Sequence, residues 1–223
     1  MCAAMPFIAS NSLPLSFGVF LAEIQTGTRI LLREPSLRQA LVLSFVEATA
    51  GAAAIVATVA YVRDALGQGD TAFTLVMAAL GLGSTVAAIL LGRATGRYEQ
   101  SVADQVELHT RRHIWAQRAL IVGGALLGAL LLPGFLAPPL FVFAALWFLN
   151  GAGQALIAIP STTLLAEHAD EAERGRAYAA HFALTHACWL ITYPAAILIL
   201  KNSRRRSPLS SPSALQFLSH KPH

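Results

Sequence analysis

The sequence predicts an all-α membrane protein with five transmembrane helices. Of its 223 residues 55% are hydrophobic and only 13% are charged, whereas a soluble domain carries about 25% charged residues. Five apolar runs are each long enough to cross a bilayer, for which a helix needs about 20 residues. Such runs would aggregate in water, so the lipid bilayer is the first expected partner of this chain.

The five expected spans follow one another closely enough to form one bundle over residues 37–200. They are Ala40–Val62, Thr71–Gly92, Ala119–Leu136, Pro139–Leu165 and Ala177–Leu200. The second span contains the sequence GLG and the third contains GGALLG. Small residues of this kind let membrane helices approach closely, which matters because lipid offers no hydrophobic gain on association.

Arginine residues alternate along the connections and predict the orientation. They gather before the first span, after the second and before the fifth, as Arg29, Arg33, Arg38, Arg93, Arg97, Arg111, Arg112, Arg174 and Arg176. The positive-inside rule places these segments in the cytoplasm. The basic clusters suit anionic phospholipid headgroups. The sequence has no basic surface interleaved with aromatic residues, so no nucleic-acid partner is expected.

The two ends fit this pattern less well. Residues 1–36 are expected to form a weakly apolar segment that becomes cytoplasmic, although a degraded span or a signal-like start is an alternative. Residues 201–223 form a basic tail rich in serine and proline, which is expected to be disordered. An odd number of spans would place this basic tail outside, so a truncated or frame-altered gene is a second interpretation of both ends.

Polar residues in the first, fourth and fifth spans recur at spacings of three, four and seven, and therefore share helix faces. The faces are Ser44, Glu47, Gly51, Thr58 and Tyr61 in the first span, Asn150, Gln154 and Ser161 in the fourth, and His181, Thr185, Cys188 and Thr192 in the fifth. A second face of the fifth span carries His186, Trp189 and Tyr193. Residues gathered in this way can point into a bundle interior or a water-filled cavity instead of lipid.

Glu47 is the only acid inside any of the five spans. An ionised carboxylate at that depth costs several kcal/mol, so Glu47 should be protonated, paired or in contact with water. We expect Glu47 to carry a coupling proton, with His181 near it. The expected lining of a substrate cavity is Asn150, Gln154, Thr185, His186 and Cys188.

Structural roles compete with these functional ones. Ser44 and Thr58 can each bond a backbone carbonyl of their own helix. Asn150 and Gln154 can serve as hydrogen-bonding contacts between helices, worth about 0.6 kcal/mol each. Trp189 and Tyr193 are more typical of packing than of a substrate site.

The sequence contains no self-sufficient metal site. His181 and Cys188 are separated by about 10 Å along a helix axis, too far for one ion with ligand distances of about 2.0–2.3 Å. Ligands for a metal would have to come from other helices, among which Glu47 is a candidate, and their identity is unknown. No cofactor is expected, and the absence of a nucleophile, base and oxyanion motif argues against an enzyme.

Two segments resemble a known transporter family. The second span ends in LLGRATGRYEQ, which resembles the short loop motif of the major facilitator superfamily. Gly92, Arg97 and Tyr98 match its glycine, arginine and aromatic residue, whereas Gly96 and Glu99 stand where the family has an acid and a second glycine. The segment ERGRAYAAHFALTHACWLITYP resembles the eleventh helix of bacterial efflux permeases of this superfamily, most closely the nickel-resistance branch.

This resemblance spans roughly Leu32–Leu200. It implies that the five spans are helices seven to eleven of a twelve-helix transporter. They would form a truncated C-terminal half of six helices, and the N-terminal half of the transporter would be its partner. The implied function is proton-coupled efflux of a small solute or a metal cation such as nickel across a bacterial inner membrane. Gly92, Arg97 and Tyr98 would then serve conformational switching. The alternative is a truncated membrane protein without transport activity, or an assembly partner.

Single cysteines test the expected orientation. Substitutions at Gln68, Gln100, Ala137 and Glu171 should react with a membrane-impermeant thiol reagent from outside, inside, outside and inside, respectively, because arginine-rich connections stay in the cytoplasm. Labelling is compared between intact cells and inverted vesicles. Reaction of Gln100→Cys in intact cells would contradict the orientation.

Overall fold

A computed structural model describes residues 17–101, 105–131 and 138–206. Over these residues the chain is helical and contains no strand. The elements are α1 (Phe17–Arg33), α2 (Pro35–Val59), η1 (Ala60–Ala65), α3 (Asp70–Ser101), α4 (Gln105–Leu131), α5 (Leu140–His168) and α6 (Arg174–Arg206). Five of them, α2 to α6, are long and apolar enough to cross a membrane. The expected all-α membrane fold with five spanning helices is confirmed.

The connection after the second span is shorter than the sequence suggested. Helix α3 continues to Ser101 and α4 already begins at Gln105. The arginines expected in a loop, Arg93, Arg97, Arg111 and Arg112, therefore lie on helices. Glutamine, glutamate and arginine favour helix. Their long side chains can also reach polar surroundings from a helix that extends past the hydrocarbon core.

Helix α1 occupies a segment that the sequence predicted only as weakly apolar. It ends at Arg33, and only Glu34 separates it from Pro35, the first residue of α2. A proline pre-sets the start of a helix and disfavours helix in the residue before it. Helix α1 packs on α6, where Gly27 lies against the carbonyl of Arg176. Glu23 forms an ion pair with Arg176 at 2.7 Å. At the other end α6 runs to Arg206, so residues 201–206 of the expected disordered tail are helical.

The end of α2 shows why a long helix stops before α3. Its last turn widens into the π-helix η1, in which the amide of Leu66 bonds the carbonyl of Tyr61 at 3.0 Å. Gly67 follows with a φ of 60°, a left-handed conformation that glycine adopts without steric cost. Arg63 and Asp70 then form an exposed ion pair at 2.5 Å across the connection.

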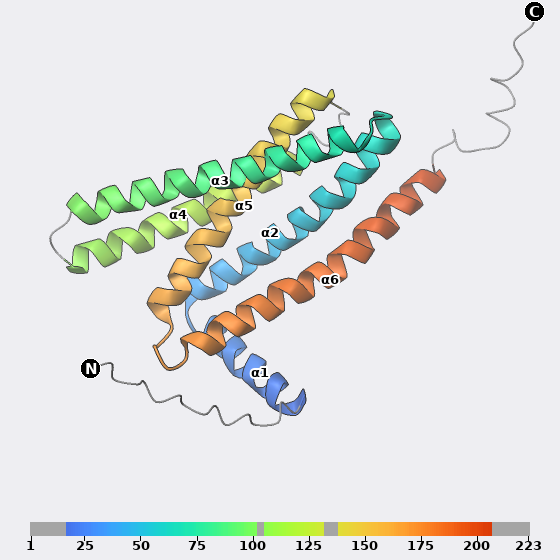
Figure 1. The fold of residues 1–223 in the computed structure, drawn as a ribbon. Helices are drawn as coiled ribbons and strands as arrows, with labels where there is room; N and C mark the ends of the chain where they lie inside the picture. The colour runs from blue at the N-terminus through green and yellow to red at the C-terminus, as the bar shows by residue number, and fades with distance from the viewer. Residues whose placement is uncertain (1–16, 102–104, 132–137, 207–223) are drawn as a thin grey trace, which may run out of the picture.

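Helix α5 is the centre of the bundle and packs against α3, α4 and α2 (Figure 1). At its start, Phe143 and Trp147 lie in an apolar cluster with residues of α2 and α3. The ring centroids of these two residues are 4.0 Å apart. A second, larger cluster joins α5 to α1, α2, α4 and α6, and its members include Leu31, Leu37, Leu120, Ile157 and Ala180. Buried α5 side chains thus recur from Phe143 to Leu165.

Glycines bring α5 into backbone contact with two neighbours. A Cβ atom on Gly83 of α3 would meet the carbonyl of Phe148. A Cβ atom on Gly151 of α5 would meet the carbonyl of Leu80. On the other side, a Cβ atom on Gly123 of α4 would lie 2.9 Å from the carbonyl oxygen of Gly153. The helices can cross this closely only because these positions carry no side chain.

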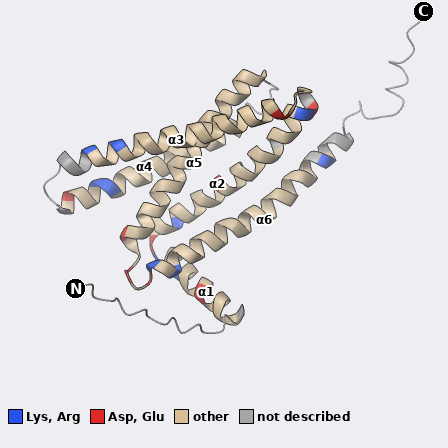
Figure 2. Ribbon diagram, in the orientation of Figure 1, with Lys and Arg blue, Asp and Glu red and all other residues tan. Residues whose placement is uncertain are grey.

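The arginine-rich segments gather at one end of the bundle. The hydroxyl of Ser36 at the start of α2 lies 3.3 Å from Nε2 of His113 on α4. The His113 ring lies 5.1 Å from that of His168 at the end of α5. Figure 2 shows Lys and Arg where α3 and α4 approach each other and where α5 leads into α6. We call this region, with the starts of α2, α4 and α6 and the ends of α3 and α5, the arginine-rich end.

The glycine contacts make a direct prediction about stability. Gly83→Val should lower the midpoint of thermal unfolding in detergent, because added methyl groups would collide with the α5 backbone at a cost of about 1–3 kcal/mol. Gly81→Val is the matched control, since Gly81 is two residues away on α3 and has open space around its Cβ position. Equal unfolding midpoints for the two variants would contradict the α3–α5 packing.

Candidate functional site

Helix α2 lies between α5 and α6 and turns its polar face toward both. The hydroxyl-bearing residues Ser44 and Thr58 are 1% and 0% exposed. Gly51 is also buried, while Glu47 and Tyr61 are half-buried. The face expected from the sequence therefore points into the bundle along its length.

A chain of hydrogen bonds links three helices at Ser44. Its hydroxyl donates to the hydroxyl of Ser161 on α5 at 3.4 Å. Nε2 of His181 on α6 lies 3.0 Å from the same Ser44 oxygen. The Ser44 hydroxyl therefore bonds both Ser161 and His181, and the tautomer of the imidazole sets which of Ser44 and His181 donates.

Glu47 lies on the next turn of α2, about 4.5 Å further along the axis from Ser44. In the described residues no hydrogen bond or ion pair reaches its carboxyl group, although the side chain is half-buried. The other acids of the spanning helices lie near helix ends. Glu47 is thus a carboxyl group in mid-span, one turn from a histidine-containing hydrogen-bond chain.

Gly51 lies one turn further along α2, where side chains of α5 and α6 approach it. The Trp189 indole lies so close that a Cβ atom on Gly51 would be 3.1 Å from its Cζ2 atom. The same Cβ position is 3.8 Å from Oε1 of Gln154. Gln154 in turn donates to Oδ1 of Asn150 at 2.7 Å. Asn150 and Gln154 thus bond each other along α5 and reach the site through Gln154.

The two polar faces of α6 have different surroundings. His181, Thr185, Cys188 and Thr192 are all half-buried. The sulfur of Cys188 lies 3.7 Å from the hydroxyl of Thr49 on α2. His186 is exposed and its ring stacks on Phe182, with centroids 3.7 Å apart. The structure brings Cys188 to α2, whereas it places His186 on the outer surface of α6.

Local backbone bonds account for some of the polar residues. Thr58 donates to the carbonyl of Ala54 at 2.6 Å, and Thr185 to that of His181 at 2.9 Å. Ser44 instead bonds across helices. Thr49 belongs to no polar face identified in the sequence, and no sequence signal marks it. Ser161 was part of such a face, but only the fold shows its partner.

Helices α2 and α6 run parallel. Three contacts establish this direction, since Ser44 meets His181, Thr49 meets Cys188 and Gly51 meets Trp189 as both chains advance. We call this contact between α2 and α6 the α2–α6 seam. The groups on it that could bind a cation are hydroxyls, one imidazole, one thiol and one carboxyl. In the described part of the chain no three His, Cys, Asp or Glu side chains are placed to hold a metal ion.

The residues of the short motif lie away from this seam. Gly92 and Arg97 are exposed on the last turns of α3, and Gly92 has open space around it. Tyr98 lies on the same helix, but its side chain is outside the described residues. The motif therefore belongs to the arginine-rich end and not to the polar centre of the bundle.

Comparison with known protein families gives a match over most of the chain. The family model of the Major Facilitator Superfamily matches residues 40–209, which include most of α2 and the helices that follow it. No curated protein and no solved structure matches the chain.

A disulfide tests the α2–α6 seam. In a Cys2→Ser background, Thr49→Cys should form a disulfide with Cys188 under mild oxidation, because the two side chains already touch at 3.7 Å. Mass spectrometry of peptides reports the cross-link. Val42→Cys is the control, since it lies about 10 Å further back on the same helix. A cross-link of equal yield from Val42, or none from Thr49, would contradict the seam.

Proposed function

The chain belongs to the Major Facilitator Superfamily and is a multi-pass membrane transporter of that type, and from this premise we propose that it exports a small solute or metal cation in exchange for protons. The observation that carries the proposal is Glu47, a mid-span carboxyl group with no partner among the described residues. Such groups in membrane helices commonly belong to proton or ion pathways.

Exchange follows from the chemistry of one carboxyl group. With its proton bound, Glu47 is neutral and tolerated in the bundle interior. A cation beside it stabilises the ionised form, so the proton leaves when the cation arrives. Loss of the cation on the far side lets a proton return. Because the carboxyl group of Glu47 binds either the proton or the cation but not both, the entry of protons is coupled to the exit of the cation.

His181 is the proposed relay for this proton. Its Nε2 atom is hydrogen-bonded to Ser44, one turn from Glu47, and Ser44 continues the chain to Ser161. Imidazole can donate and accept protons near neutral pH, which hydroxyls alone cannot. Gln154 and Asn150 on α5 and Thr185 and Cys188 on α6 supply neutral polar groups beside α2, suited to a solute that is bound and released.

Nickel is the proposed metal substrate, on the resemblance to nickel-resistance permeases. Imidazole is a favourable ligand for nickel, and Glu47 would supply an oxygen ligand and a compensating charge. Other ligands would come from other helices or from water. Within the proposal the five spans correspond to helices seven to eleven of the superfamily fold. The arginine-rich end faces the cytoplasm, and Gly92, Arg97 and Tyr98 act in conformational switching.

Neutralising Glu47 separates coupling from binding. In proteoliposomes containing the full-length transporter, Glu47→Gln should abolish export driven by a proton gradient yet permit exchange of labelled substrate across the membrane. Glutamine keeps the shape but cannot titrate. Glu107→Gln is the matched control, because Glu107 forms a surface ion pair with Arg111 at 2.5 Å and should leave both activities intact.

His181→Ala should shift the pH dependence of export more than it lowers the amount of folded protein. Nickel and an organic cation are compared as substrates in the same vesicles, with proton release followed by an internal dye. Wild-type pH dependence in Glu47→Gln would show that Glu47 is only a structural group. Proton release with the organic cation alone would exclude nickel.

A further inference from the structure

A second polar feature lies between α3 and α4, away from the seam of α2 and α6. It is a hollow of about 280 Å³ at the arginine-rich end. Its lining residues are Thr95 from α3 and Leu108, Arg111, Arg112, Ile114, Trp115 and Arg118 from α4. Within α4, positions 108, 111, 115 and 118 are spaced by three or four residues, so one helix face carries them toward α3.

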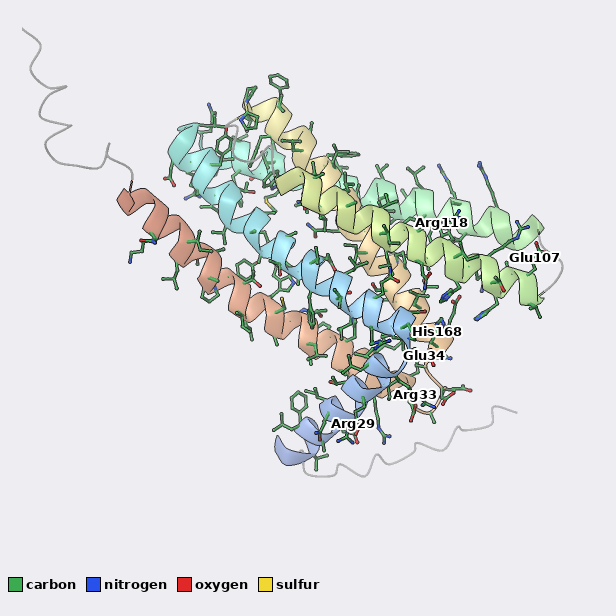
Figure 3. The ribbon with its side chains drawn as sticks, turned by 180° about the vertical axis from the view of Figure 1, so that it is seen from behind. Arg29, Arg33, Glu34, Glu107, Arg118 and His168 are labelled. Carbon is green, nitrogen blue, oxygen red and sulfur yellow. The ribbon has the colours of Figure 1, made fainter. Side chains whose placement is uncertain are left out.

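The charge of the hollow is positive. None of its lining residues is acidic. Arg111 is paired with Glu107 on the preceding turn. Arg118 is exposed, and in the described part of the chain it makes no hydrogen bond or ion pair. Figure 3 shows Arg118 and Glu107 well separated along α4, so Glu107 does not neutralise Arg118.

The position of Arg118 along α4 indicates the level of the membrane surface. It is the last basic residue before the apolar run that begins at Ala119. Trp115 lies one turn earlier, and tryptophan is enriched at the level of lipid headgroups. Val122, one turn after Arg118, is 56% exposed and begins an apolar surface. The same helix face thus carries cations, an interfacial aromatic and then an apolar side chain.

We propose that this hollow binds the phosphate of an anionic phospholipid from the surrounding bilayer. Arg118 binds the phosphate, since a guanidinium group can bond two phosphate oxygens at once. Trp115 lies beside the glycerol region, and Val122 contacts an acyl chain. A free phosphate ion would leave the apolar part of this face unused, whereas a lipid occupies both parts.

The lipid would join α3 and α4 where their direct contact is sparse. Thr95, the α3 side of the hollow, lies within the motif GRATGRYEQ, two residues before Arg97. Occupation of the hollow would therefore affect the part of α3 to which conformational switching is assigned. The inference concerns lipid binding and stands whether or not Glu47 couples protons.

Fluorescence quenching of Trp115 tests the proposal. The chain has three tryptophans, so Trp147→Phe with Trp189→Phe leaves Trp115 as the sole indole. The full chain is reconstituted in phosphatidylcholine with a rising fraction of dibrominated phosphatidylglycerol. Bromine quenches an indole in contact with it. The hollow beside Trp115 should bind the anionic lipid about fivefold more strongly than the zwitterionic one.

Arg118→Gln should reduce the ratio of anionic to zwitterionic lipid binding toward one. Arg63→Gln removes the same charge at the opposite end of the bundle and should leave the preference unchanged. Native mass spectrometry of the chain with its tryptophans intact provides a second measurement, in which retained phosphatidylglycerol adducts should fall in Arg118→Gln. No preference in the parent protein, an equal preference in Arg118→Gln, or an equal loss in Arg63→Gln would overturn the proposal. Displacement of the adducts by millimolar inorganic phosphate would assign the hollow to a free anion instead.

Discussion

Backbone-to-backbone packing of α5 is the contact on which the rest of this transporter depends. Lipid gives helices no hydrophobic gain on association, so the bundle is held by van der Waals packing and by hydrogen bonds. Gly83 and Gly151 allow α3 and α5 to touch, and Gly123 allows α4 to do the same from the other side. Held in this central position, α5 turns Asn150 and Ser161 into the interior, where they are 5% and 0% exposed.

The polar seam follows from that placement. With α5 central, α2 is packed on one side by α5 and on the other by α6, so one serine can bond both neighbours. Hydrogen bonds join the hydroxyls of Ser44 and Ser161 and Nε2 of His181, whereas the carboxyl of Glu47 is left without a partner in the described residues. A bundle stabilised only by packing would gain nothing from such a group. Its position beside the hydrogen-bond chain is the basis of the proposed proton exchange.

The sequence predicted the fold well because the deciding properties belong to single segments. Length and hydropathy alone define each of the five spans. The extent of the helices beyond the lipid could not be read from hydropathy, since the polar ends of α3 and α4 are helical for reasons of propensity. The sequence did not predict helix α1, because polar residues interrupt its apolar ones. Only the tertiary structure shows that α1 packs against α6.

For the site, the sequence alone determined which residues share a helix face, because the 3.6-residue period is a local property. It thereby marked Ser44, Glu47 and His181 as inward candidates. Only the tertiary structure decided which faces meet. It joined Cys188 to Thr49, which no periodicity had marked, and placed His186 on the outer surface of α6. The physical reason is that partners more than a hundred positions apart are chosen by how helices cross, and the crossing depends on backbone contacts that no single segment contains.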